Sequence, residues 1–319
     1  FDYRNELWFG LHTRASCFLR IEISKDTFTL AGIVRSARRP LGWQAPGPQP
    51  AGDQGRVDLQ PEDDEDLSFL TGDWRIFQKL RGHRWSLDDL MTAHTAARHA
   101  EVVGATSALD LGCGLGSVLL MLAWRLPHLR VTGIEAQTDR AQMGRRSIAW
   151  NGANDRCRII DGDLRNESLL PSSVRFSLIS GTPPYFPMGS GSLSEKTHAA
   201  ACRFESRGGI EAYIAAADRW LASKGRFVVC TSALEVDRLK SAVNANSLHV
   251  IEHVEVIPKE GKAPLVMIDV CSRIAETKIE RSITVRDRSD QWTAAFQDVR
   301  REMGMPVIPP GPQSRLSSA

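Results

Sequence analysis

Short apolar runs alternate with helical periods along the chain from about Trp74 onward. Apolar runs without a helical period predict buried strands at 107–111, 130–135, 158–160, 176–180 and 226–230. Between them, apolar residues recur at helical spacing in 117–125, 138–150 and 210–222. Because strands that alternate with helices form βαβ units, the pattern predicts an α/β fold, with helices on both faces of a doubly wound parallel sheet.

The last two apolar runs of this region are connected differently. Residues 249–257 and 263–270 each read as a strand, and only Pro258-Lys259-Glu260-Gly261-Lys262 separates them. A crossover between parallel strands needs a dozen or more residues. The pair is therefore predicted to be an antiparallel C-terminal hairpin at the edge of the sheet.

The first 70 residues follow another pattern. Residues 1–38 contain short alternating stretches such as Phe18–Ile23, which predict a small β-containing extension. Residues 39–61 are rich in Pro, Gly and Gln, and an acidic block follows at 62–66. A segment so poor in apolar residues is expected to be a linker or long loop that packs little. The acidic block is expected to be a solvated surface, with an intramolecular mimic of nucleic acid as the less favoured alternative.

These patterns predict three parts of the chain: an N-terminal extension (1–70), an α/β domain (71–275) and a C-terminal tail (276–319).

The 319 residues include 40 Lys and Arg against 38 Asp and Glu, so the formal charge of +2 does not indicate a strongly basic nucleic-acid binder. The longest apolar run, Val118–Trp124, is far shorter than the roughly 20 residues that span a bilayer.

The cysteine pattern bears on metals and compartment. Six cysteines are widely spaced and form no C-x-x-C pair, which argues against a zinc site and against a disulfide-stabilised secreted fold. We therefore expect no metal and a reducing compartment, either the cytoplasm or an organellar matrix. Because the sequence begins at Phe1, it places no tighter limit on targeting.

A glycine-rich turn follows the first predicted strand of the domain. Its sequence, Asp110-Leu-Gly112-Cys-Gly114-Leu-Gly116, leads into a predicted helix. Glycines allow a tight turn and close approach of the backbone to a ligand, and the helix start offers unpaired N–H groups. The D-x-G-x-G-x-G spacing is the form seen in S-adenosylmethionine (SAM) dependent methyltransferases, although an ordinary strand-to-helix turn can contain such glycines as well.

Two acidic side chains follow the next two predicted strands. Glu135 ends the second strand, where a carboxylate typically accepts hydrogen bonds from both ribose hydroxyls of a nucleoside cofactor. Asp163 comes just past the third strand and is placed to accept the adenine amino group. A surface glutamate and a turn-forming Asp-Gly pair are the structural alternatives.

A proline loop follows the fourth predicted strand, with the sequence Gly181-Thr182-Pro183-Pro184-Tyr185-Phe186-Pro187. Consecutive prolines cannot continue a central strand, so the chain must leave the sheet where ligands of parallel sheets bind. The loop resembles the [D/N/S]-P-P-[Y/F/W] motif of amino-group methyltransferases. There the first side chain and the first proline carbonyl accept hydrogen bonds from the target amino group, and the aromatic ring stacks on the base.

A longer match narrows the resemblance. Pro-Pro-Tyr-Phe-Pro is followed by Ala-Cys-Arg-Phe-Glu at 201–205 and by Leu-Ala-Ser-Lys-Gly-Arg-Phe at 221–227, and Gly-His-Arg-Trp-Ser-Leu-Asp-Asp-Leu-Met-Thr-Ala precedes the glycine turn at 82–93. Together these segments resemble the bacterial family that methylates an adenine next to the anticodon of valine tRNA, over roughly residues 73–273. Protein-glutamine methyltransferases share Pro-Pro-Tyr but usually lack the second segment.

The resemblance implies a seven-stranded class I methyltransferase (Rossmann-like) sheet, SAM as cofactor, and an exocyclic amino group of adenine in tRNA or rRNA as the target. It assigns the base site to Thr182, Pro183, Pro184 and Tyr185. It assigns the cofactor site to Asp110, Gly112, Gly114, Gly116, Glu135 and Asp163.

One departure from the family pattern leaves a second hypothesis open. The family has Asn where this chain has Thr182, and a threonine hydroxyl reaches less far than an amide carbonyl. The chain could therefore be a catalytically weak or inactive homologue that serves as an RNA-binding or assembly subunit, with protein partners at its two extensions.

A basic and aromatic stretch, 74–85, offers phosphate contacts and base stacking. A hairpin with aromatics in the core and cations in water explains the same pattern equally well. His94 and His198 are expected to be structural, because no potential ligands lie at metal spacing.

Overall fold

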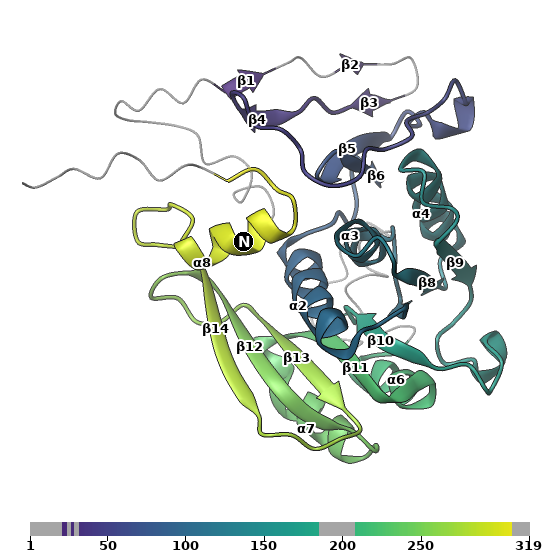
Figure 1. The fold of residues 1–319 in the computed structure, drawn as a ribbon, viewed down its shortest axis with the longest axis vertical. Helices are drawn as coiled ribbons and strands as arrows, with labels where there is room; N and C mark the ends of the chain where they lie inside the picture. The colour runs from purple at the N-terminus through teal and green to yellow at the C-terminus, as the bar shows by residue number, and fades with distance from the viewer. Residues whose placement is uncertain (1–20, 24–26, 29–31, 185–207, 308–319) are drawn as a thin grey trace, which may run out of the picture.

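The computed structural model describes residues 21–23, 27–28, 32–184 and 208–307. Its centre is an eight-stranded sheet in the order β14-β12-β13-β11-β10-β7-β8-β9 (Figure 1). The parallel strands are β7 (Ser107–Leu111), β8 (Arg130–Glu135), β9 (Cys157–Asp161), β10 (Phe176–Gly181) and β11 (Leu221–Ser232). They include every strand predicted for this part, although β11 begins at Leu221, inside the predicted helix 210–222. The α/β fold class is confirmed.

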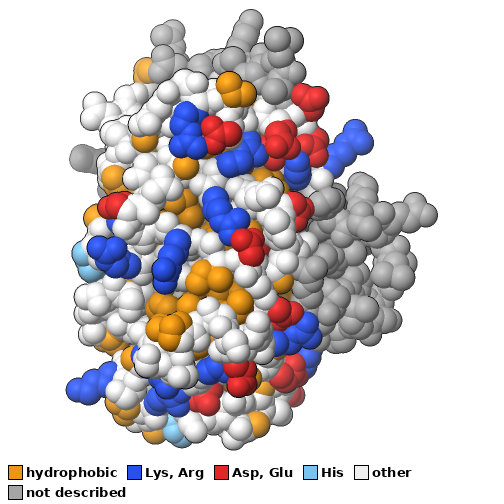
Figure 2. All heavy atoms as spheres, turned by 90° about the vertical axis from the view of Figure 1, so that its right-hand side faces the viewer, with side chains coloured by type: hydrophobic (Ala, Val, Ile, Leu, Met, Phe, Trp, Pro, Cys, Tyr) orange, Lys and Arg blue, Asp and Glu red, His pale blue; other side chains and the backbone are white. Residues whose placement is uncertain are grey.

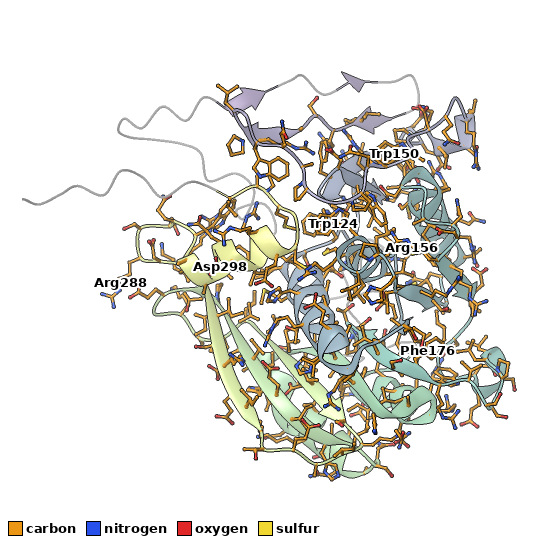
Figure 3. All side chains as sticks on the ribbon, viewed as in Figure 1. Trp124, Trp150, Arg156, Phe176, Arg288 and Asp298 are labelled. Atoms are coloured by element: carbon orange, nitrogen blue, oxygen red, sulfur yellow. The ribbon has the colours of Figure 1, made fainter. Side chains whose placement is uncertain are left out.

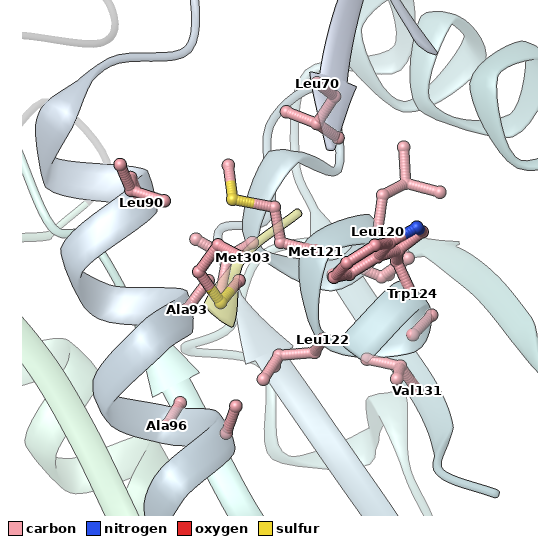
Figure 4. Close-up of a cluster of buried hydrophobic side chains, with 14 of the residues drawn as sticks. Leu70, Leu90, Ala93, Ala96, Leu120, Met121, Leu122, Trp124, Val131 and Met303 are labelled. Atoms are coloured by element: carbon pink, nitrogen blue, oxygen red, sulfur yellow. The ribbon is translucent and has the colours of Figure 1, made fainter. Parts of the chain in front are cut away.

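Helices cover both faces of this sheet. The helices are α2 (Leu87–Val103), α3 (Ser117–Arg125), α4 (Thr138–Trp150), α6 (Ile210–Trp220), α7 (Val236–Asn244) and α8 (Ala294–Glu302). Side chains of α2, α3, α4 and α8 share one hydrophobic cluster, part of which is drawn in Figure 4, and those of α6 and α7 share another. Neighbouring strand residues enter opposite clusters, as Val228 and Val229 do, because side chains alternate along a strand. None of the described helices is long and apolar enough to cross a bilayer.

The predicted hairpin forms, but it is not the edge of the sheet. β12 (His249–Lys259) and β13 (Val266–Ser272) pair antiparallel, as expected. β14 (Ile279–Arg286) then pairs parallel with β12 and adds an eighth strand outside the seven that the resemblance implied. The sequence of β14, Ile-Glu-Arg-Ser-Ile-Thr-Val-Arg, contains no continuous apolar run, so its pattern did not indicate a strand.

The C-terminal residues after 276 also contribute to the core. α8 places Phe296 and Val299 in the larger hydrophobic cluster, and Met303 follows them there. His94 on α2 contacts Glu302 at 3.0 Å, so this histidine has the structural role expected of it. His198 lies outside the described residues.

Two small sheets form from the N-terminal residues. β1 (Ile21–Ile23) pairs with β4 (Arg38–Pro40), and β2 (Thr27–Phe28), β3 (Ile33–Val34), β5 (Glu65–Thr71) and β6 (Trp74–Lys79) form a four-stranded sheet. These elements lie above α3 and α4 in Figure 1.

The acidic block is only partly the solvated surface that was expected. Residues 62–64 are exposed, but Glu65 and Asp66 are 1% and 0% exposed. Arg146 of α4 donates to Glu65 at 2.8 Å, and Arg84 donates to both oxygens of Asp66 at 3.0 Å. Buried carboxylates are tolerated when cations and hydrogen bonds compensate their lost hydration, and here those partners come from distant parts of the sequence.

The Pro- and Gly-rich segment is also packed, contrary to expectation. Leu59, in the short 3-10 helix Val57–Leu59, is 2% exposed. Arg146 donates to the carbonyl oxygens of Asp58 at 2.9 Å and Gln60 at 2.6 Å. A Cβ on Gly47 would lie 2.5 Å from the Trp124 ring. Figure 3 shows Trp124 and Trp150 on the side of the domain that faces these N-terminal residues.

Candidate functional site

The glycine turn has the backbone conformation that only glycine adopts easily. Gly112, Gly114 and Gly116 have φ values of +59°, +56° and +82°, and Gly116 is the N-cap of α3. A Cβ on Gly112 would lie 2.1 Å from the Tyr213 hydroxyl oxygen, and one on Gly114 would lie 3.2 Å from the Arg140 guanidinium. Any side chain at Gly112 would collide with a buried ring. The backbone of this turn therefore carries no side chains at its glycines, directly after the carboxyl end of β7, as the sequence predicted.

Glu135 is tied to this turn. Its Oε2 accepts a hydrogen bond from the Gly114 backbone N–H at 2.8 Å, and its Oε1 accepts one from the Gln137 N–H at 2.8 Å. The side chain is buried at the end of β8. The surface alternative for Glu135 is thus wrong. Each carboxylate oxygen keeps a second lone pair, so Glu135 can also accept hydrogen bonds from a ligand.

Asp110 lies under the turn with one oxygen unpaired. Its Oδ1 accepts a hydrogen bond from the Ser180 hydroxyl at 2.7 Å, and its buried Oδ2 has no hydrogen-bond partner among the described residues. Burial, together with the charges of Asp89 and Glu135, raises the pKa of this carboxyl to about 7, although the hydrogen bond from Ser180 acts to lower it. A buried carboxyl with an unused oxygen, next to a glycine turn, is typical of a ligand site.

Asp89 was not predicted as a site residue. It lies in the first turn of α2, where its Oδ2 accepts the Ser86 N–H at 2.8 Å and its Oδ1 accepts the Ser117 hydroxyl at 2.9 Å. Burial raises its pKa to about 6. Ser86 and Asp89 form a helix capping box, which the Ser-Leu-Asp-Asp sequence could have revealed. Through Ser117, at the start of α3, this cap fixes α2 against the glycine turn.

Asp163 carries a different set of contacts. One of its oxygens accepts from the Arg165 N–H and Nε at 2.9 Å, and the other accepts from Arg165 Nη2 at 2.6 Å. The Gly162 N–H donates to the Glu135 carbonyl at 2.9 Å, which holds the turn before Asp163 against the end of β8. The structure thus brings Asp163 to the same edge of the sheet as Glu135, in an ion pair with Arg165.

The proline loop begins beside the glycine turn. In the parallel pairing of β10 with β7, Ser180 is opposite Asp110 and Gly181 is opposite Leu111. Thr182 is half-buried, Pro183 buried and Pro184 half-buried directly after the strand. Tyr185, the predicted stacking residue, lies outside the described residues.

A further side chain, which was not predicted, lies against both motifs. A Cβ on Gly181 would lie 2.8 Å from Cδ1 of Tyr213, the same residue whose hydroxyl approaches Gly112. Tyr213 comes from α6, about a hundred residues after the glycine turn, and no local sequence pattern distinguishes it from an ordinary core aromatic.

The basic and aromatic stretch, 74–85, follows the structural alternative. Trp74 and Phe77 are fully buried, so neither ring can stack on a base. The Arg75 guanidinium lies 3.9 Å from the centre of the Phe69 ring and donates to the Arg35 carbonyl at 2.7 Å.

The view in Figure 2 shows Lys and Arg side chains interleaved with Asp and Glu around an apolar area. In the part of the chain that the structure describes, no three His, Cys, Asp or Glu residues form a group that could hold a metal ion.

Comparisons with known proteins agree with this geometry. Residues 108–188 match the family described as "Methyltransferase domain". The chain is 26% identical over 204 residues, which are 64% of this chain and 85% of the relative, to the tRNA1(Val) (adenine(37)-N6)-methyltransferase of Haemophilus influenzae. It is 36% identical over 134 residues to the enzyme of the same name from Porphyromonas gingivalis, with 41% of this chain and 51% of the relative covered.

A solved structure shows the same fold. A protein of Agrobacterium tumefaciens described as a predicted O-methyltransferase superposes with a TM-score of 0.52 at 17% identity, covering 69% of this chain and 98% of that one. The resemblance read from the motifs is therefore confirmed. The chain contains a methyltransferase domain of the class I fold and is similar to the bacterial tRNA1(Val) adenine-N6-methyltransferases.

Proposed function

We propose that this chain is a SAM-dependent methyltransferase that acts on the exocyclic amino group of adenine in RNA, with tRNA as the favoured substrate class. One observation carries the proposal. Gly181 and Leu111 are opposite each other at the ends of two adjacent parallel strands. The proline loop and the glycine turn, which follow these residues, therefore begin side by side. A cofactor over one loop and a base in the other would meet at this point. The names of the similar bacterial enzymes support adenine N6 and tRNA.

The residues at this edge of the sheet fit SAM. Gly112 and Gly114 form the turn at positive φ without side chains, Glu135 can accept ribose hydroxyls, and Asp110 has a buried oxygen without a hydrogen-bond partner among the described residues. Asp163 is assigned to the adenine amino group of the cofactor, because it lies at the same edge of the sheet as Glu135 and a carboxylate accepts N–H donors. When bound, SAM supplies a methyl group on a positively charged sulfur.

The proline loop would orient the target amine. The Thr182 hydroxyl and the Pro183 carbonyl each accept a hydrogen bond from the adenine amino group, which directs the nitrogen lone pair toward the methyl carbon. Bound SAM would supply the methyl group to this nitrogen and leave as S-adenosylhomocysteine, and the methylated amine would release its proton to water. Pro184 fixes the loop, and Tyr185 stacks on the base, which must be flipped out of its helix.

The test is methyl transfer to unmodified small RNA, with binding of S-adenosylhomocysteine (SAH) measured in parallel. The proposal predicts that the wild-type protein binds SAH and incorporates methyl, and that Tyr185→Ala lowers incorporation while SAH still binds. Incorporation into protein glutamine instead of RNA would contradict the assigned substrate. RNA methylation that Tyr185→Ala leaves undiminished would contradict the assignment of the base site.

Thr182 favours one second candidate, a weak or inactive homologue that binds RNA or serves as an assembly subunit. The hydroxyl of Thr182 is shorter than the amide of the Asn that the resembling family has there, and loss of one oriented group in a transition-state site typically costs about 10²-fold in rate. SAH binding without turnover on any RNA would favour this candidate. For either candidate, the bacterial relatives make the cytoplasm the proposed location.

A further inference from the structure

Tyr213 occupies an unusual place at the junction of the two loops. Its side chain comes from α6 and is only 6% exposed. The hydroxyl oxygen lies 2.1 Å from the position a Cβ on Gly112 would take, and the ring lies 2.8 Å from the corresponding position on Gly181. Both residues are glycine, so the ring fits between the ends of β7 and β10. The phenol thus lies between the glycine turn and the start of the proline loop.

The hydroxyl has no hydrogen bond to any residue in the described part of the chain. Charged groups nonetheless surround it: Glu135, Asp110 and Arg140 all act on its ionisation. Burial, followed by the charges of Glu135 and Asp110, raises the pKa of Tyr213 well above its usual value, so the phenol keeps its proton. A hydroxyl that no described residue pairs is available to a ligand, to which it can donate one hydrogen bond or from which it can accept one.

The position of Tyr213 also defines which part of the cofactor it would meet. Glu135, assigned to the ribose, ends β8, on one side of β7. Thr182, assigned to the target amine, follows β10, on the other side of β7. The sulfur of SAM must lie between ribose and amine, and the amino-acid arm of the cofactor leaves from that sulfur. The Tyr213 hydroxyl lies at this intermediate position, next to Gly112.

We propose that the Tyr213 hydroxyl forms a hydrogen bond with the amino-acid arm of the bound cofactor. The inference rests on the proposed function, because it requires a SAM site at the glycine turn. The arm carries an ammonium and a carboxylate, and a protonated phenol can accept from the first or donate to the second. Tyr213 is thereby a cofactor-contacting residue supplied by α6.

The test is calorimetric binding of two ligands to wild type and Tyr213→Phe. SAH carries the amino-acid arm, whereas 5′-methylthioadenosine has the same nucleoside and sulfur without the arm. A hydrogen bond to a charged group is typically strong enough that its loss weakens binding about tenfold or more. We expect Tyr213→Phe to weaken SAH binding by about this factor and to leave the affinity for 5′-methylthioadenosine unchanged.

Thr231→Val provides a matched control. Thr231 on β11 carries a buried hydroxyl that has no hydrogen-bond partner among the described residues, and β10 separates its strand from β7. This variant removes an unpaired hydroxyl from the core away from the glycine turn, so we expect it to bind both ligands as wild type does. The melting temperature of ligand-free Tyr213→Phe should equal or exceed that of wild type, because the lost hydroxyl had no partner.

Three results would overturn the inference about Tyr213 and leave the proposed function intact. They are an unchanged SAH affinity of Tyr213→Phe, an equal loss of its affinity for both ligands, and a melting temperature of ligand-free Tyr213→Phe more than about 5 °C below that of wild type. The second would show that Tyr213 only shapes the glycine turn, and the third that its hydroxyl supports the fold. Wild-type protein that binds neither ligand would overturn the proposed function as well, which separates that failure from the others.

Discussion

Gly181 on β10 lies directly opposite Leu111 on β7, so the proline loop and the glycine turn begin as neighbours at one edge of the sheet. Crevices outside the carboxyl ends of parallel strands are where α/β proteins bind ligands. At this edge the glycine turn follows one strand, and Thr182 and Pro183 follow the next. The proposed chemistry depends on this adjacency, and the predictions below test its parts.

Replacement of Gly114 by Leu should abolish cofactor binding. Gly114 has a φ of +56°, a Cβ there would meet the Arg140 guanidinium at 3.2 Å, and the Gly114 N–H is held by Glu135 at 2.8 Å. A leucine would strain the turn and fill the space above it. Calorimetry with SAH measures the effect. Gly261→Leu, at a positive φ with open space around it, controls for backbone strain alone.

The free energy of unfolding should depend on pH through Asp110. Burial raises its folded pKa to about 7 from an ordinary value of 3.8. A group with a raised acidic pKa binds more protons in the folded state, so its contribution to stability falls as pH rises from about 4 to about 7. Asp110→Asn removes this contribution.

The stability of Asp110→Asn relative to wild type should therefore increase between pH 5 and pH 8. Urea titrations at both pH values, without ligand, give the difference. A constant difference across this range would show that Asp110 ionises normally in the folded protein.

The Pro- and Gly-rich N-terminal segment should stabilise the domain. Leu59 is 2% exposed and Val57, two residues earlier, is 86% exposed, so the two form a matched pair. Leu59→Ala should lower the free energy of unfolding by about 2–4 kcal/mol, as large-to-small changes in cores do. Val57→Ala should change it by no more than about 0.5 kcal/mol. Equal effects of the two substitutions in chemical denaturation would show that the segment is not docked in solution.

Replacement of Thr182 by Asn should raise kcat on RNA, by up to about 10²-fold, because the amide carbonyl reaches further toward the target amine. SAH affinity should stay the same, since Thr182 follows β10 and not the cofactor strand β7. Steady-state methyl transfer and calorimetry on both proteins separate the two effects. A neutral or harmful effect on kcat would indicate a loop adapted to another target.

Much of the fold could be predicted because the parallel strands are apolar runs flanked by clear turns, as in Ser107–Leu111. The elements that were missed have mixed sequences. β14 mixes charged residues with Ile and Val, and Leu59 is one of few apolar residues in a polar segment. Their partners, β12 and the α4 surface, are remote in the sequence, so no local pattern indicates that they pack.

The candidate site was predictable to a similar degree. Gly112, Gly114 and Glu135 lie where the spacing placed them, because a strand-to-helix turn is a local structure. Tyr213 could not be inferred in this way. Its role depends on two glycines that the fold brings to it from other strands, so only the three-dimensional structure reveals it.

The most direct test of the central claim is the identity of the methylated nucleoside. Unmodified tRNA is incubated with SAM and the wild-type protein, digested to nucleosides and analysed by mass spectrometry, with Gly114→Leu as the control that lacks the cofactor site. The account predicts N6-methyladenosine with wild type and none with Gly114→Leu. A methyl group on any other nucleoside, or none on RNA while SAH binds, would contradict it.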